Sequence, residues 1–197
     1  MKNAPPLTYI VGLGNPGKKY ERTYHNVGAI ALEYFATKLS ERGDSVNHRR
    51  RRPLFEYVES GNCLFIKPTT FMNESGKAVA SLGKLFRAKS SELLLVHDDS
   101  DLAIGTFKLS FGRNSGGHHG AESVIRSLKT KEFWRLRIGI RAAEHRGSSE
   151  NEGSPRLKAS HLVLRTIRPK ERKVLDRVFE ESWEKLTSRL QCYPETH

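Results

Sequence analysis

The sequence predicts a single α/β domain with a mixed, mostly parallel sheet and helices on both faces. Short apolar runs suited to buried strands alternate with longer segments of helical periodicity, and glycine-rich loops separate them. A chain of 197 residues with 37% hydrophobic content can also bury one sizeable core. We therefore expect residues 1–197 to form one domain, with ligands bound beyond the carboxyl ends of the strands.

The first half of the chain begins with a strand, a loop and a helix. Residues 9–11 are a β-branched and aromatic run that ends in the glycine loop 12–17. Apolar residues then recur at helical spacing over 27–39, and Gly43 is suited to stop that helix. The other expected elements are an exposed basic loop over 48–53, a hairpin of strands 55–59 and 64–66, and a helix from 74 to 86.

The second half begins with an apolar run over 93–96, short enough for a central strand, whose end would deliver His97, Asp98 and Asp99. A polar segment over 142–168 is expected to be a mobile lid, and an amphipathic final helix is expected over 169–190. Between them we expect a strand over 104–111, a flexible loop over 112–117, a helix over 121–128 and a strand over 134–140.

The charge of the chain suggests the class of its partner. Lys and Arg number 34 against 22 Asp and Glu, which gives a net charge of +12 and a pI of about 9.9. Such basicity favours a nucleic acid partner, although excess Lys and Arg can also simply solvate a surface. There is no run of about 18 apolar residues and no segment typical of a signal peptide, so we expect a cytoplasmic protein without a membrane partner. Cys63 and Cys192 are too few for a disulfide framework or a zinc site.

Two short motifs suggest other functions. The loop 12–17 matches G-x-G-x-x-G after a strand, but Pro16 is awkward where backbone N–H groups should meet a pyrophosphate, and no acidic residue ends a second strand at the required spacing. A simple tight turn explains it equally well. The run from His97 to Asp101 has the residue types of a metal site, as in a metal-dependent phosphohydrolase, but a complete ligand set is hard to find.

A different chemistry is indicated by polar residues that lie at the ends of predicted elements. His25, Asp98, Asn15 and Asn73 can converge above one edge of the sheet. A neutral imidazole can take a proton from water, while a carboxylate on its other nitrogen fixes its tautomer. Side-chain amides can hold a substrate or donate to a developing oxyanion.

Five ordered segments give the sequence a resemblance to a known family. Residues 11–17, 20–28, 67–76, 97–102 and 135–140 read VGLGNPG, YERTYHNVG, KPTTFMNESG, HDDSDL and RLRIGI. These segments resemble the bacterial peptidyl-tRNA hydrolases. The resemblance covers about residues 9–141. It implies a monomeric α/β enzyme without metal, cofactor or obligate protein partner that hydrolyses peptidyl-tRNA from stalled or aborted translation.

The resemblance also implies roles for individual residues. His25 would be the catalytic base, Asp98 its orienting partner, and Asn15 and Asn73 the substrate and oxyanion contacts. Arg137, expected near the end of a strand, would contact a tRNA phosphate. The further substrate-binding residues that it implies are Tyr20, Phe71, Met72, His118, His119, Lys108 and Arg113.

Several positions depart from the family pattern, among them Tyr24 before His25 and Arg141 after Ile140. His119 stands where the family usually has asparagine, and Ser110 stands where it often has a phosphate-clamping lysine, although Lys108 and Arg113 are close enough in sequence to compensate. The alternative that these departures leave open is a catalytically weakened, RNA-binding relative of the same fold. Retention of His25, Asp98, Asn15 and Asn73 argues for the enzyme.

Overall fold

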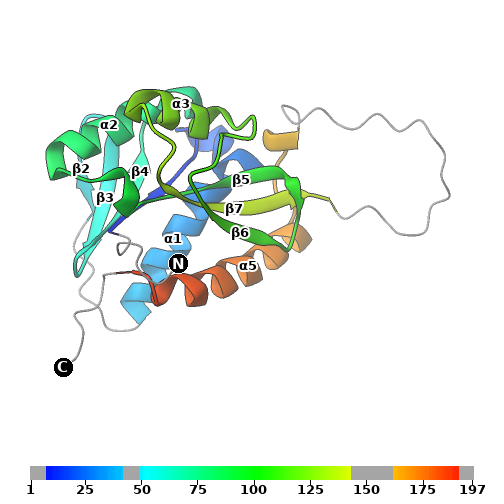
Figure 1. Cartoon of the computed structure of the whole chain (residues 1–197). Helices are drawn as coiled ribbons and strands as arrows, with labels where there is room; N and C mark the ends of the chain where they lie inside the picture. Colours follow the sequence, from blue (N-terminus) through cyan, green and yellow to red (C-terminus); the bar gives the residue numbers. More distant parts are fainter. Residues whose placement is uncertain (1–7, 42–48, 143–161, 191–197) are drawn as a thin grey trace.

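A seven-stranded mixed sheet in the order β2-β3-β4-β1-β5-β7-β6 forms the centre of the computed structural model (Figure 1). The structure describes residues 8–41, 49–142 and 162–190. The central strands β4, β1, β5 and β7 pair in parallel, and antiparallel pairings add β3 and β2 at one edge and β6 at the other. The predicted mixed sheet is confirmed. The strands are β1 (Tyr9–Gly12), β2 (Arg50–Arg51), β3 (Phe55–Ser60), β4 (Cys63–Pro68), β5 (Leu93–Ala103), β6 (Phe107–Phe111) and β7 (Trp134–Arg141).

Helices cover both faces of this sheet, as predicted. Helices α1 (Val27–Glu41) and α5 (Pro169–Thr187) lie on one face, and α2 (Ser75–Phe86) and α3 (His119–Leu128) lie on the other (Figure 1). Successive strand residues point to opposite faces, so Leu94 joins the apolar cluster under α1 and α5 while Leu95 joins the cluster under α2 and α3. The described 3₁₀ turns are η1 (Lys18–Tyr20), η2 (Tyr24–Asn26), η3 (Met72–Glu74) and η4 (Ser90–Glu92).

A glycine at the start of α1 decides how closely this helix approaches β5. A Cβ added to Gly28 would lie 2.1 Å from the carbonyl oxygen of Val96, so only glycine fits there. His25 precedes Gly28 by three residues and Asp98 follows Val96 by two. The close packing of α1 on β5 therefore brings these two side chains together.

Three predicted boundaries in β5, β6 and α3 were wrong. Strand β5 does not end before His97 but continues to Ala103, because its pairing with β7 continues through Asp98 opposite Ile138. Residues 104–106 form a turn in which Gly105 has a φ of +90°, so β6 begins only at Phe107. Helix α3 begins at His119 and not at residue 121, because the side chain of His118 caps it.

Three further expectations concern the edge of the sheet, the predicted lid and the last helix. Part of the expected basic loop is β2, a two-residue edge strand of exposed arginines, because Arg50 and Arg51 pair with β3. Helix α5 ends at Thr187, three residues before the predicted end. Most of the predicted lid, residues 143–161, lies outside the described residues. Among the helices of the described ranges, none has the length and apolar character needed to cross a membrane.

Candidate active site

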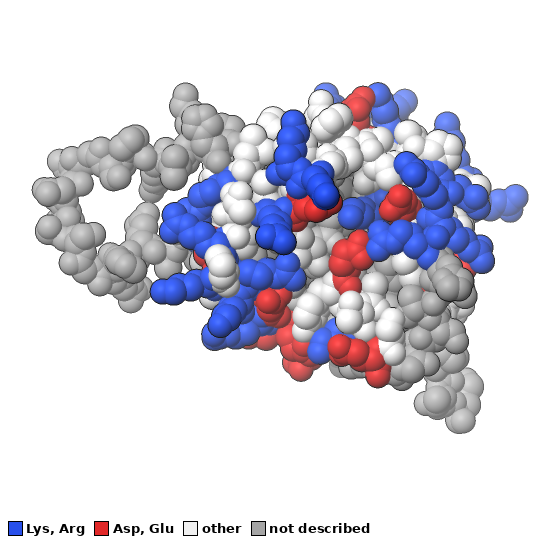
Figure 2. Space-filling view, turned by 180° about the vertical axis from the view of Figure 1, so that it is seen from behind, with Lys and Arg blue, Asp and Glu red and all other residues white. Residues whose placement is uncertain are grey.

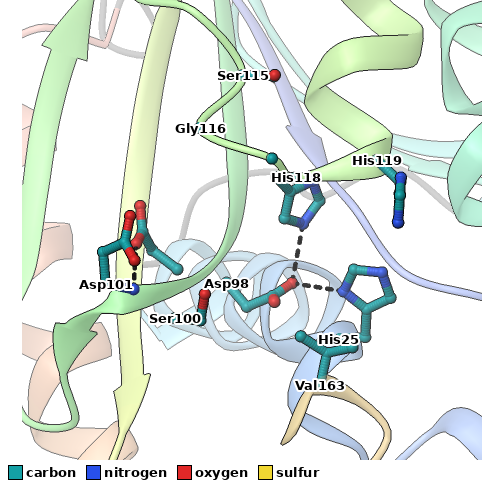
Figure 3. Close-up of a pocket in the computed structure, with 11 residues that line it drawn as sticks. His25, Asp98, Ser100, Asp101, Ser115, Gly116, His118, His119 and Val163 are labelled. Carbon is teal, nitrogen blue, oxygen red and sulfur yellow. Dashed lines mark hydrogen bonds and ion pairs between the residues drawn. The ribbon is translucent and has the colours of Figure 1, made fainter. Parts of the chain in front are cut away.

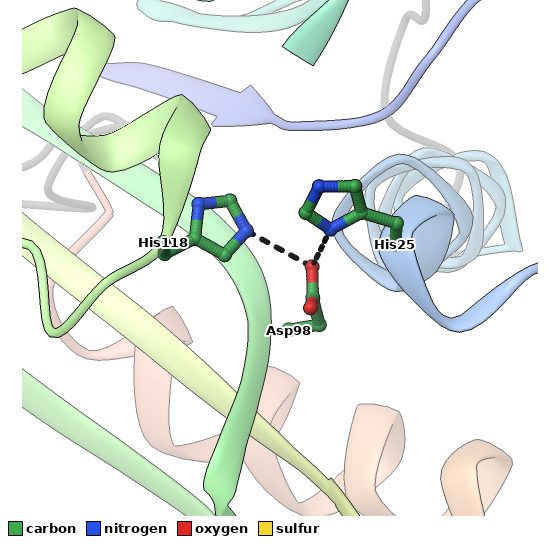
Figure 4. Close-up of side chains that lie close together, drawn as sticks. All are labelled: His25, Asp98 and His118. Atoms are coloured by element: carbon green, nitrogen blue, oxygen red, sulfur yellow. Dashed lines mark hydrogen bonds and ion pairs between the residues drawn. The ribbon is translucent and has the colours of Figure 1, made fainter. Parts of the chain in front are cut away.

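Two histidines share one buried carboxylate oxygen at the heart of the site. His25 comes from η2, Asp98 from β5, and His118 caps α3. The Oδ1 atom of Asp98 lies 2.9 Å from Nδ1 of His25 and 3.0 Å from Nε2 of His118 (Figure 4). Asp98 is only 1% exposed. The pair of His25 and Asp98 predicted from the sequence is therefore assembled, with a second imidazole on the same oxygen.

The ionisation of Asp98 fixes the donor and acceptor roles in this cluster. Burial alone would raise the pKa of Asp98, but the charge and hydrogen bonds of His118 and His25 outweigh it and hold this pKa below its ordinary value. Nδ1 of His118 accepts from the backbone N–H of Ala121 at 3.1 Å, so Nε2 of His118 carries the proton and donates to the carboxylate. His25 donates from Nδ1 in the same way. Its Nε2 is then free of a proton in the neutral ring.

A cavity of about 250 Å³ opens beside the two imidazoles. The second ring nitrogen of His25 lies on the side of the ring that faces His119 (Figure 3). Exposed His119 belongs to the first turn of α3 and lines the cavity. The lining residues are His25, Asp98, Asp99, Ser100, Asp101, Ser115, Gly116, Gly117, His118, His119 and Val163. His25 and Asp98 therefore both lie at the wall of this cavity.

A third imidazole, His97, supports the cluster from within the core. Its Nδ1 donates to the backbone carbonyl of Asp98 at 2.6 Å, and its ring centroid lies 4.3 Å from that of His118. Burial, with His118 as a further cause, lowers the pKa of His97 well below its ordinary value. His97 is therefore neutral, and its ring packs behind that of His118.

Asn15 lies in a separate hydrogen-bond network that begins next to His25. Its backbone N–H donates to Oδ1 of Asn26 at 2.8 Å, and its carbonyl accepts from Nδ2 of Asn26 at 3.0 Å. Its own Oδ1 accepts from the backbone N–H of Met72 at 2.8 Å. Asn15 thus joins the first loop to η3, which the sequence alone did not reveal. The one feature of the sequence that could have suggested this network is Asn26, an amide that follows His25 directly at the start of a helix.

The other residues expected to bind the peptide lie outside the lining of the cavity. Met72 is 4% exposed and packs in the core. Asn73 is exposed on η3 and lines a different pocket with Glu74. Phe71 is 50% exposed. The rings of Tyr20 and Phe71 meet edge to face at 6.4 Å and present an aromatic surface.

The residues expected to bind phosphate line a second, more open pocket of about 630 Å³. We call this pocket, lined by Phe107, Lys108, Leu109, Ser110, Arg113, Asn114, Ser115, Gly116, Arg135, Arg137 and Lys185, the basic groove. Arg137 lies in the middle of β7, opposite Lys108 on β6, and not near a strand end as expected. It donates from Nε to Asp99 at 2.5 Å. The prediction missed Arg135 and Lys185, because only strand pairing and the fold of α5 bring them here.

Basic side chains are not confined to this groove. Much of the molecular face in Figure 2 carries Lys and Arg, gathered toward its two sides with acidic side chains between them. This distribution agrees with the net charge of +12. It supplies the sequence-independent attraction that a polyanion needs.

His25, Asp98 and His118 also have the residue types of a metal site. Their ligand atoms lie within 4.8 Å of one another. Binding a cation would, however, require Nε2 of His118 to lose the proton that the bond from Ala121 places there. The arrangement thus fits a hydrogen-bonded triad better than a ligand set.

Comparison with known proteins identifies the family of this chain. A family model described as peptidyl-tRNA hydrolase matches residues 9–194. The chain belongs to the peptidyl-tRNA hydrolase family. The family suggested by five short motifs is therefore confirmed, and the match extends through the C-terminal third that those motifs did not cover.

Individual peptidyl-tRNA hydrolases show the same likeness in sequence and in structure. The enzyme of Lactobacillus johnsonii is 35% identical over 178 residues, which are 89% of each chain. That of Coxiella burnetii is 43% identical over 137 residues, 70% of this chain and 71% of the other. The crystal structure of peptidyl-tRNA hydrolase from Acinetobacter baumannii superposes with a TM-score of 0.77 at 29% identity, over 94% of this chain and 89% of that one.

Proposed function

We propose that this chain hydrolyses the ester between the peptide and the 3′ ribose of tRNA in peptidyl-tRNA, and so recycles tRNA from aborted translation. The observation that carries the proposal is the contact of 2.9 Å between His25 and Asp98 beside an open cavity. Because this pair is intact, the alternative of a catalytically weakened RNA-binding relative is not favoured.

In the proposed reaction, His25 acts as a general base on water. Nε2 of His25 takes a proton while the water oxygen attacks the ester carbonyl carbon, and Asp98 stabilises the imidazolium that forms. The tetrahedral intermediate then collapses. Its 3′ ribose oxygen leaves with the proton from Nε2, so the base is restored and no covalent enzyme intermediate is needed.

The amides of Asn15 and Asn73 are the proposed donors to the substrate and to the oxyanion. Asn15 is held in place at both its backbone and its Oδ1, which leaves Nδ2 as a donor. Neither Asn15 nor Asn73 lines the cavity, so both proposals rest on the family motifs. Met72, Phe71 and Tyr20 are proposed to contact the peptide, and His119 the ester end of the substrate.

The decisive test is an assay of purified protein with peptidyl-tRNA in EDTA. Free tRNA should appear at the same rate with and without the chelator, because the proposed base and its partners are protein groups. Loss of activity in EDTA, restored by a divalent cation, would instead assign His25, Asp98 and His118 to a metal site. If no tRNA is released under either condition, the proposed activity is wrong.

We propose that Arg137, Lys108 and Arg113 bind tRNA phosphate in the basic groove. Replacing Arg137 with alanine should weaken tRNA binding and reduce the slope of log affinity against log salt by about one, since one phosphate contact is lost. Binding of deacylated tRNA across a salt series measures both quantities. Arg141→Ala, an exposed arginine of the same strand outside the groove, is the matched control. An unchanged slope with unchanged affinity would remove Arg137 from the interface.

We also propose that the protein works as a monomer in the cytoplasm, where its substrate is formed. The peptidyl-tRNA site requires no second chain, because His25, Asp98 and His118 come from one chain. Sedimentation at the assay concentration tests the oligomeric state. A dimer whose dissociation abolishes hydrolysis would contradict the proposal.

A further inference from the structure

The loop between β6 and α3 is a shared wall of the cavity and the basic groove. Ser115 and Gly116 line both of them. One face of this segment therefore adjoins the catalytic imidazoles, and another adjoins the arginines proposed to bind phosphate. A shift of the loop changes both pockets at once.

This loop is rich in glycines, which offer no side chains to hold it. Gly112, Gly116 and Gly117 have φ values of +66°, +64° and +79°, a region that favours glycine. A Cβ added to Gly116 or Gly117 would meet no atom within 4 Å. Hydrogen bonds to the backbone of the loop are therefore important for its position.

Arg135 supplies two of those hydrogen bonds from beneath the loop. Its Nη2 donates to the carbonyl of Asn114 at 2.6 Å, and its Nη1 donates to the carbonyl of Ser115 at 3.3 Å. The residue is only 2% exposed. Burial and the nearby charges of Arg137 and Arg113 lower the pKa of Arg135, so the buried cation needs these carbonyl acceptors.

The second of these carbonyls connects Arg135 to the catalytic cluster. The backbone N–H of His118 also donates to the carbonyl of Ser115, at 3.4 Å. The ring of His118 in turn donates to Asp98, the partner of His25. A single carbonyl thus joins the buried arginine to the residue that holds the catalytic carboxylate.

We propose that Arg135 is a positioning residue for catalysis. It holds the segment from Asn114 to Gly116 so that His118 stays on Asp98, and it thereby couples phosphate binding in the basic groove to the geometry of the cavity. The effect on catalysis rests on the proposed function, whereas the claim that Arg135 holds the loop does not. Arg135 also lines the basic groove, but both of its terminal nitrogens are bonded to the loop carbonyls, so we assign its guanidinium to the loop and not to a phosphate.

Two variants separate this role from a purely electrostatic one. Arg135→Lys keeps the charge but replaces the forked pair of donors by one nitrogen, and Arg135→Met removes both. For each variant, kcat should fall about tenfold to a hundredfold, because small displacements of catalytic groups are costly. The loss should be equal for peptidyl-tRNA and for a peptide esterified to adenosine, which cannot reach the groove. For Arg135→Lys, the affinity for deacylated tRNA should stay within about twofold of the parent.

Hydrogen exchange supplies a readout that does not depend on activity. The amides of Gly116 and His118 should exchange faster in both variants, while amides of β5 exchange as in the parent. Arg141→Lys, on the same strand but exposed, should change neither exchange nor kcat. In the parent, saturating deacylated tRNA should slow exchange at His118.

Several results would overturn the inference. The first is that kcat and amide exchange in the variants equal those of the parent. The second is that only tRNA affinity falls, while kcat for the adenosine ester is unchanged. The third is faster exchange of amides throughout β5. If neither variant folds, the parent still tests the coupling. An exchange rate of the His118 amide that does not change when tRNA is added decides against it. If the parent releases no tRNA at all, the proposed function fails. Exchange at Gly116 and His118 still tests the role of Arg135.

Discussion

Replacing His25 with alanine should lower kcat for peptidyl-tRNA about a thousandfold, which corresponds to about 4 kcal/mol of transition-state stabilisation. Neither His118 nor His97, the two imidazoles packed next to Asp98, can take over its task. His118 donates from Nε2 to Asp98 and accepts at Nδ1 from Ala121, so neither of its nitrogens is available as a base. His97 is buried behind His118. Single-turnover kinetics on purified peptidyl-tRNA measure the loss.

The same variant should bind tRNA almost as tightly as the parent, because the basic groove and the surface lysines and arginines are unchanged. Affinity for deacylated tRNA is therefore the internal control. Thr37→Ala, an exposed position on α1, serves as a control for unrelated changes in the helix that follows His25. Comparable rates for His25→Ala and the parent would remove His25 from the mechanism.

The sequence alone predicted the layers of the fold and the pairing of His25 with Asp98. Apolar runs such as residues 93–96 indicate a buried strand by composition, and the motif around His25 was sufficient to suggest that it pairs with Asp98. Boundaries set by polar residues were predicted less well. The strand β5 continues through His97 and Asp98, where the carboxylate of Asp98 accepts from His25 and Nδ1 of His97 donates to a backbone carbonyl, and no local sequence pattern reports such partners.

The parts of the site that the sequence did not predict depend on contacts between distant segments. His118 was expected to bind substrate, and its bond to Asp98 follows only from where α3 begins. Arg135 and Arg137 differ little as residues of one strand, yet one is buried under a loop and the other pairs with Asp99. Period-2 alternation places both on the same face but does not say which of them a loop covers.

Replacing Asp98 with asparagine should lower kcat about a hundredfold, less than the loss of the base itself. Both imidazoles donate to the same atom, Oδ1 of Asp98 (Figure 4). The carbonyl oxygen of an asparagine can accept both hydrogen bonds, so the substitution removes the negative charge and keeps the geometry. What is lost is the stabilisation of the imidazolium that forms when His25 takes a proton from water.

The pH dependence of stability separates this effect from unfolding. Because the pKa of Asp98 lies below its value in an unfolded chain, the carboxylate's contribution to stability is complete above about pH 5 and is lost only as the pH falls further. The difference in unfolding free energy between parent and Asp98→Asn should therefore be constant from about pH 6 to 8 and shrink in acid. Kinetics at pH 7 on protein shown to be folded by circular dichroism then report the charge alone. Full activity of Asp98→Asn under those conditions would mean that the carboxylate only holds the two histidines in place.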